Sequence, residues 1–137
     1  MIFMNSWTDE ETGASKVLIR HRKHIYPGYA ICHPDDEYSK YTGCRYAEMR
    51  AKIAALKAEH KQKKAACEEC GKFVKAVSQY KKFNKEDPTA KAMYRQLNRR
   101  IKEVNKLVDK INQLEFDLKL AINQQVRIKK RIKVNNH

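Results

Sequence analysis

The sequence predicts an α+β fold in which a small N-terminal antiparallel β-sheet precedes two long antiparallel helices that form a coiled-coil hairpin. Two runs rich in β-branched and aromatic residues lie within residues 16–33, a pattern typical of paired strands. Two longer stretches, 42–83 and 89–134, repeat apolar residues in steps of three and four. A short turn-forming segment around Pro88 separates these stretches, which favours a helical hairpin.

The N-terminal part divides into an arm and a β-hairpin. Residues 1–15 carry polar and turn-forming side chains, so we expect a flexible arm ahead of a single domain over 16–137. In residues 16–33, Pro27 and Gly28 separate the two β-type runs and predict the hairpin turn. A lone hairpin is marginally stable in water, so it should pack on a helix or on a second copy.

The first helix is expected over residues 42–83, with Thr42 as its N-cap. Gly71 is its weak point, because glycine costs about 1 kcal/mol relative to alanine in a helix interior. The spacing predicts a buried seam formed by Tyr46, Met49, Ile53, Leu56, His60, Lys63, Cys67, Cys70, Val74 and Val77.

The second helix is expected over residues 89–134, beginning beside Pro88. Its predicted seam comprises Leu97, Ile101, Val104, Val108, Ile111, Leu114, Leu118, Ala121, Gln125, Ile128 and Ile132. Apolar residues also lie off this seam, namely Leu107, Phe116, Leu120, Val126 and Val134. This extra apolar surface predicts a homodimer or higher homo-oligomer in which helical hairpins pack together.

The charge of the chain indicates an anionic partner. The net charge is +14, and 18 Lys and Arg face only 6 Asp and Glu in residues 71–137, compared with 12 against 10 in residues 1–70. No apolar run approaches the roughly 20 residues of a membrane span, and Met1 to Trp7 lack the features of a signal peptide. We therefore expect a cytoplasmic protein with reduced cysteines and no membrane contact.

For the residues with reactive or metal-binding side chains, the sequence favours structural roles. Cys67 and Cys70 form a C-x-x-C but occupy the predicted helix seam, and no second pair completes a zinc site. The group of Cys32, His33, Cys44 and His24 matches no zinc spacing. Phosphate-binding glycine motifs are absent from the sequence. We expect no catalytic residue, no metal and no cofactor, and thus a protein that is not an enzyme.

One face of the second helix combines aromatic, amide and basic side chains. Steps of four, four, three, four and four place on it Asn112, Phe116, Leu120, Asn123, Arg127 and Arg131. An aromatic platform, two amides and two guanidiniums could hold a base and phosphates. Arg20 and Arg22 of the hairpin would join this site if the hairpin packs nearby. The alternative is an apolar helix shoulder that continues into a solvated basic end.

A motif at the start of the first helix resembles small proteins of bacteriophages and prophages. The stretch from Ala30 to Arg50 contains C-x3-D-E-Y-x4-G-x3-A, with Cys32, Asp36, Glu37, Tyr38, Gly43 and Ala47 at the named positions. With an N-terminal sheet, two C-terminal helices and terminal arginines, the chain resembles the Thoeris anti-defence protein family of nucleotide-signal sponges. The resemblance implies a dimer in the host bacterial cytoplasm that captures its ligand between sheet and helices, with Arg127 and Arg131 on the phosphates.

Three functions are consistent with these patterns. The first is a phage-encoded, non-catalytic anti-defence protein that sequesters a small anionic nucleotide, either a cyclic ADP-ribose-type or a cyclic oligonucleotide immune signal. The second is a basic coiled coil that binds nucleic acid or inhibits a CRISPR effector, and it accounts directly for the high charge. The third is a structural coiled-coil module whose charge maintains solubility.

Overall fold

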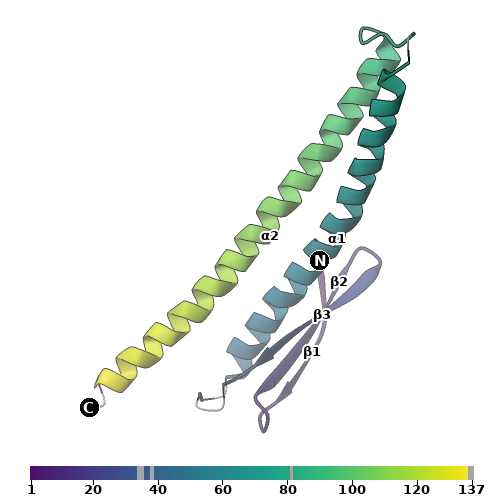
Figure 1. Cartoon of the computed structure of the whole chain (residues 1–137). Coiled ribbons are helices and arrows are strands. Elements are labelled where there is room, and N and C mark those ends of the chain that lie inside the picture. Colours follow the sequence, from purple (N-terminus) through teal and green to yellow (C-terminus); the bar gives the residue numbers. More distant parts are fainter. Residues whose placement is uncertain (34–35, 38, 81, 136–137) are drawn as a thin grey trace. The chain divides into compact units, whose positions relative to one another are not determined.

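The fold is α+β, with a three-stranded antiparallel sheet followed by two long helices (Figure 1). The computed structural model describes residues 1–33, 36–37, 39–80 and 82–135, and the side chains of residues 126–135 are outside this description. The elements in chain order are β1 (Ile2–Asp9), β2 (Ala14–His21), β3 (His24–Ile31), α1 (Lys40–Ser78) and α2 (Pro88–Asn135). The predicted fold class is confirmed.

The expectation of a flexible arm over residues 1–15 is wrong for most of that segment. Residues 2–9 form β1, which pairs antiparallel with β2 from Ile2 opposite Arg20 to Asp9 opposite Ala14. Gly13 closes the connecting turn at a φ of 70°, which glycine adopts without strain, and its N–H donates to the Asp9 carbonyl at 2.9 Å. Backbone hydrogen bonds to β2 order this segment, although its local composition does not predict a strand.

The expected β-hairpin is present, but its turn lies elsewhere. β2 and β3 pair from Ala14 opposite Ile31 to His21 opposite His24, so the turn is Arg22 and Lys23, with Arg22 at a φ of 58°. Pro27 and Gly28, expected to form the turn, lie inside β3. Proline is tolerated there because β3 is an edge strand, which leaves one row of backbone groups outside the ladder.

The two helices are close to their predicted bounds of 42–83 and 89–134. α1 begins at Lys40 rather than Thr42, and the Oγ of Ser39 accepts a hydrogen bond from the Thr42 N–H at 3.3 Å. α1 continues through Gly71 and ends at Ser78. α2 begins with Pro88 at its first position, where a missing N–H costs nothing.

The chain forms two compact units. The first comprises residues 1–56 and 111–137, and its core is the inner face of the sheet packed on α1. Val17, Ile19 and Ala30 contribute from β2 and β3, and Ala47 and Ala51 contribute from α1. The four-residue step between these alanines gives α1 a flat face, so β3 can approach its backbone closely.

The second unit, residues 57–110, is a helical hairpin made of the remaining parts of α1 and α2. Val74 and Ala90 are buried in it, and the rings of Phe83 and Tyr94 meet edge to face at 6.4 Å. Leu107, expected off the seam as free apolar surface, is only 5% exposed, whereas the predicted seam residue Ile101 is 40% exposed. The buried face of α2 in this unit therefore includes Leu107 and leaves Ile101 partly exposed, so it differs from the predicted seam.

The helices of the described chain include none with an apolar stretch that could cross a membrane.

Candidate functional site

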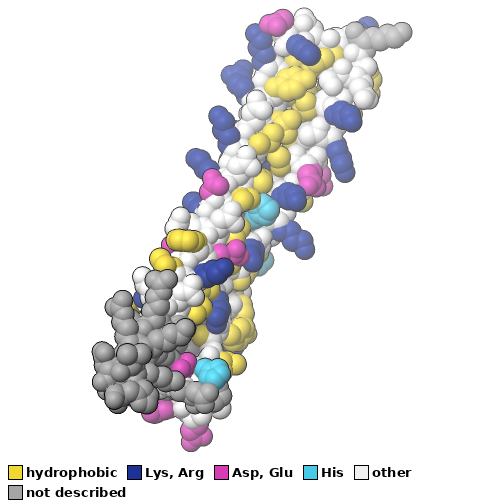
Figure 2. Space-filling view, turned by 60° about the vertical axis from the view of Figure 1, so that its left-hand side comes forward, with side chains coloured by type: hydrophobic (Ala, Val, Ile, Leu, Met, Phe, Trp, Pro, Cys, Tyr) yellow, Lys and Arg dark blue, Asp and Glu magenta, His cyan; other side chains and the backbone are white. Residues whose placement is uncertain are grey.

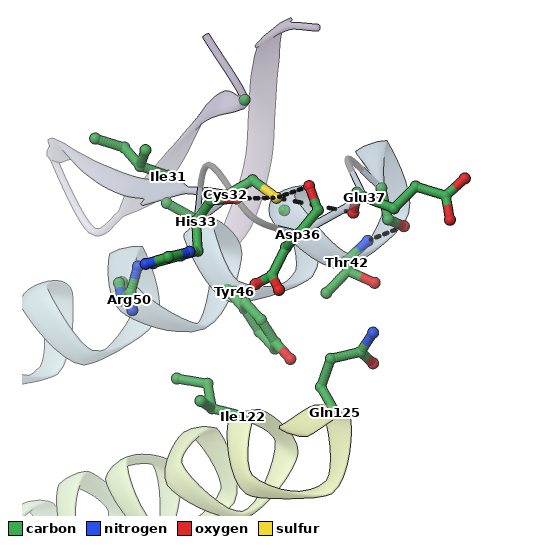
Figure 3. Close-up of a pocket in the computed structure, with 14 residues that line it drawn as sticks. Ile31, Cys32, His33, Asp36, Glu37, Thr42, Tyr46, Arg50, Ile122 and Gln125 are labelled. Carbon is green, nitrogen blue, oxygen red and sulfur yellow. Dashed lines mark hydrogen bonds between the residues drawn. The ribbon is translucent and has the colours of Figure 1, made fainter. Parts of the chain in front are cut away.

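A hollow of about 220 Å³ lies inside the first unit, where three elements meet (Figure 3). Its walls are the end of β3 and the segment after it, the first turns of α1, and the part of α2 that carries Ile122 and Gln125. It is a candidate site for a small ligand, because it is concave and brings together charged, amide and aromatic groups.

The segment after β3 is fixed by Cys32. The Cys32 N–H donates to the Gly13 carbonyl at 2.8 Å, which joins the segment to the β1–β2 turn. The thiol lies 3.6, 3.7 and 3.8 Å from the carbonyl oxygens of His33, Asp36 and Glu37, so it can donate to each of them in turn. Asp36 also donates its N–H to the His33 carbonyl at 2.9 Å. Cys32 therefore shapes the rim of the hollow, a role that needs a reduced thiol.

The α1 wall presents Tyr46 and Arg50, one helical turn apart. The Tyr46 hydroxyl donates to the Ala121 carbonyl at 3.3 Å, which links α1 to α2 and fixes the ring. The Arg50 guanidinium donates from Nη1 to the Tyr29 carbonyl at 2.8 Å, and in Figure 3 it lies beside His33. This bond uses one of its five donors, so the remaining N–H groups can bind an anion.

The hollow presents a carboxylate, an amide, an aromatic ring and a guanidinium on its walls. Figure 3 shows the Asp36 carboxylate and the Gln125 amide approaching the space beside Tyr46 from opposite walls. A carboxylate accepts hydrogen bonds from ribose hydroxyls, and an amide both donates to and accepts from the edge of a base. Arg50 adds the planar guanidinium that binds phosphate most effectively. Together these side chains can hold a ligand, and we assign no bond-breaking role to any of them.

The predicted stripe on α2 lies mostly on an exposed face of the helix. Asn112, Asn123 and Phe116 are exposed, the last at 61%, and Leu120 is also exposed. The hollow is lined instead by Ile122 and Gln125, on a neighbouring face of the same helix. The backbone of Arg127 and Arg131 belongs to α2, and their side chains lie outside the described residues.

Arg20 and Arg22 lie at the far end of the sheet from the hollow. Arg20 pairs with Ile25 near the β2–β3 turn, whereas the hollow is reached from Ile31 and Cys32 at the other end of β3. Within one chain the structure therefore does not bring these two arginines to the hollow. The expected convergence of the hairpin cluster and the α2 stripe would need a second copy.

The second unit carries exposed basic side chains on both helices. Residues 57–110 contain 16 Lys and Arg against 7 Asp and Glu, a net charge of +9. Figure 2 shows Lys and Arg along both sides of an apolar band near the α1–α2 turn. On α2, steps of three and four connect a row of exposed residues that we call the α2 basic row, namely Lys91, Arg95, Arg99, Lys102, Lys106 and Lys110.

The cysteines are all free and half-buried. The part of the chain that the structure describes contains no group of three or more His, Cys, Asp or Glu side chains placed to hold a metal ion. Cys67 and Cys70 occupy the α1 seam of the second unit, as predicted for packing residues.

Replacing both Cys67 and Cys70 with alanine should reduce the stability of the second unit by about 1–2 kcal/mol, because two partly buried sulfur atoms lose their packing contacts. Urea unfolding followed by circular dichroism measures this change. Elemental analysis of the purified wild type is the control, since stoichiometric zinc that disappears in the double variant would mean that the pair binds metal.

Sequence reasoning misses the residues that line the hollow. Arg50 is part of the motif-bearing stretch but receives no role from it, and the heptad spacing assigns Tyr46 only to the helix seam. Gln125 carries the clearest signal, because an amide at a seam position of a coiled coil usually has a specific partner. The contribution of Asp36 depends on the turn that Cys32 forms, which spacing alone does not show.

Comparison with protein-family models, curated proteins and solved structures gives no match for this chain. The function is therefore inferred from the chemistry of its residues.

Proposed function

We propose that this chain is a phage-type, non-catalytic anti-defence protein that binds and sequesters a cyclic ADP-ribose-type or cyclic oligonucleotide immune signal. The observation that supports the proposal is the hollow of the first unit, which brings Arg50, Asp36, Gln125 and Tyr46 together from three elements. These are the groups that phosphate, ribose, base edge and base face would each require. Tight binding without turnover is enough to remove a signal from solution.

The volume of the hollow supports a ligand site that is shared between two copies of the chain. Pockets for drug-sized ligands usually measure about 300–1,000 Å³, and the hollow measures about 220 Å³. One chain would therefore enclose only part of a cyclic dinucleotide-sized ligand. A second copy would complete the enclosure, and the exposed Phe116 and Leu120 give α2 an apolar surface on which that copy could pack. The proposed sponge is thus a homodimer or a higher assembly.

The Arg50→Ala variant should bind the signal roughly 10- to 100-fold more weakly, because a charge-assisted bond to phosphate contributes about 1.5–3 kcal/mol. Calorimetry with a cyclic ADP-ribose and with a cyclic dinucleotide measures the effect. Gln125→Ala should weaken binding less, and Arg127→Ala and Arg131→Ala test the predicted phosphate contacts. Mass spectrometry of the released ligand should show an unchanged molecule.

Arg45→Ala is the matched control, since Arg45 is exposed on the same helix and does not line the hollow. It removes the same charge and should leave affinity unchanged. Thermal unfolding of Arg50→Ala separates loss of the ligand contact from loss of the bond to Tyr29. If Arg50→Ala and Arg45→Ala weaken ligand binding equally, the proposed site is refuted. It is also refuted if the wild type binds neither the cyclic ADP-ribose nor the cyclic dinucleotide.

The alternative function, binding of nucleic acid or of a nucleoprotein such as a CRISPR effector, is favoured by a separate observation. The α2 basic row follows one helix face through the second unit, where the net charge is +9. A row of exposed cations along a helix can neutralise successive phosphates of a duplex. Binding of this kind has a steep salt dependence, which capture in the hollow does not require.

A further inference from the structure

The outer face of the sheet, which points away from α1, carries exposed aliphatic side chains (Ile2, Ile25 and Ile31) together with aromatic and basic ones. Side chains alternate along β2, so Val17 and Ile19 point into the core while Lys16, Leu18 and Arg20 point outward. Trp7 of β1 and Tyr29 of β3 lie on the same outer face and are each 56% exposed. Large aromatic rings left this open on a sheet face usually mark a binding surface.

Three of these side chains form one row across the sheet. Lys16 pairs directly with Trp7 on one side and with Tyr29 on the other. Neighbouring strands are about 4.8 Å apart, so the two rings flank the lysine with roughly 10 Å between their strands. The Lys16 Nζ lies 5.7 Å from the centroid of the Tyr29 ring, within range of a cation–π interaction. We call this row, together with Arg20, the sheet platform.

The platform borders a hollow of about 430 Å³ lined by Trp7, Lys16 and Leu18 with the neighbouring Asn5 and Ser6. It therefore offers an aromatic wall, a cation and an amide in one place. Asp9 is the acidic residue at the end of this face, and its carboxylate accepts hydrogen bonds from the Glu11 N–H at 3.1 Å and the Thr12 hydroxyl at 2.9 Å. These bonds hold the acid in the β1–β2 turn, so the centre of the face remains basic.

We propose that the sheet platform binds single-stranded nucleic acid, with bases stacked on Trp7 and Tyr29 and phosphates on Lys16 and Arg20. Aromatic rings interleaved with cations on an open sheet suit this ligand, because every base has a face that stacks and every nucleotide has a phosphate. A second copy of the chain fits less well, since contact through this face would bury Lys16 and Arg20, and the acid that the face offers them, Asp9, already accepts two hydrogen bonds. The platform shares no residue with the hollow that we assign to the nucleotide signal.

Trp7 is the only tryptophan of the chain, so its fluorescence reports directly on the platform. Titration with an oligothymidine of about 12 nucleotides should quench this fluorescence saturably. Tyr29→Leu and Lys16→Gln should each weaken binding roughly 5- to 100-fold, the range found when a stacking or phosphate contact is removed. Circular dichroism melting should remain unchanged, because both side chains lie on the outer face.

Tyr80→Leu and Lys23→Gln are the matched controls, since Tyr80 and Lys23 are exposed and lie outside the platform. They should bind the oligothymidine as the wild type does. Absence of quenching would overturn the proposal, as would binding that survives both platform variants. A shift in Trp7 emission with protein concentration alone, accompanied by a doubled mass in light scattering, would identify the face as a homodimer interface instead and would also overturn it.

Discussion

Replacing Gly28 with alanine should destabilise the first unit by about 3 kcal/mol or more, the upper end of the range for overpacked cores. A Cβ at Gly28 would overlap the carbonyl oxygen of Ala47 and lie 2.5 Å from the backbone nitrogen of Ala51. Both atoms belong to the α1 backbone, which cannot rotate away as a side chain can. The sheet and α1 would have to separate, exposing the core around Val17 and Ile19.

The Gly71→Ala variant is the matched control and should have the opposite effect. Gly71 lies inside α1, and a Cβ added there would be 3.9 Å from its nearest neighbour, the Leu97 Cδ1, which is an ordinary contact. Alanine at this position should stabilise the helix by about 1 kcal/mol, because glycine has the larger backbone entropy in the unfolded chain.

Urea unfolding measures both variants with two signals. Trp7 fluorescence reports on the sheet, and circular dichroism reports mainly on the helices. We expect Gly28→Ala to shift the fluorescence transition to much lower urea and Gly71→Ala to shift the helical transition slightly upward. A Gly28→Ala protein as stable as the wild type would show that β3 does not pack this closely on α1.

Replacing Lys102, Lys106 and Lys110 with glutamine should make duplex binding much less sensitive to salt, if the chain binds nucleic acid along the α2 basic row. Each phosphate contact contributes about 0.9 to the slope of log affinity against log salt, so the slope should fall by about two to three units. The three side chains are exposed and spaced by one helical turn, and glutamine is a good helix former. The fold should therefore be unaffected.

A second triple variant distinguishes direct contact from the effect of total charge. Lys23, Lys40 and Arg45 are exposed residues of the first unit, and replacing them with glutamine removes the same three charges. Anisotropy of a labelled DNA duplex, measured between about 50 and 200 mM salt, gives both slopes. Only the variants in the α2 basic row should change the slope strongly. Equal slopes for the two triple variants would mean that net charge attracts the duplex while the row does not contact it.

The Arg50 calorimetry and the salt titrations of the α2 basic row variants together distinguish the two proposed functions. A sponge loses its signal through Arg50 and is indifferent to the α2 basic row. A protein that binds along a duplex responds to the row and is indifferent to Arg50. The measurements use different residues in different units, so neither result can be mistaken for the other.

Part of the candidate site follows from the sequence and part does not. The basic character of the chain and the amide at seam position Gln125 are visible in the sequence. The sequence does not show that Gln125 lies near Asp36 and Arg50. This arrangement requires the Cys32 thiol to order the segment after β3 and the Tyr46 hydroxyl to join α1 to α2. The predicted α2 stripe is a correct helical face whose described members are exposed rather than part of the hollow.

Local periodicity is enough to predict the order of sheet and helices and the near-correct bounds of α1 and α2, because each of these depends on residues close together in the chain. Contacts between segments far apart in the sequence determine the other features of the fold. Residues 2–9 become a strand only because β2 offers a ladder, and Gly28 belongs to a strand rather than a turn because it pairs with Val17 of β2. Leu107 is buried because the opposing helix meets that face of α2. Local sequence preference does not contain these features, since the partner that produces each of them lies elsewhere in the chain.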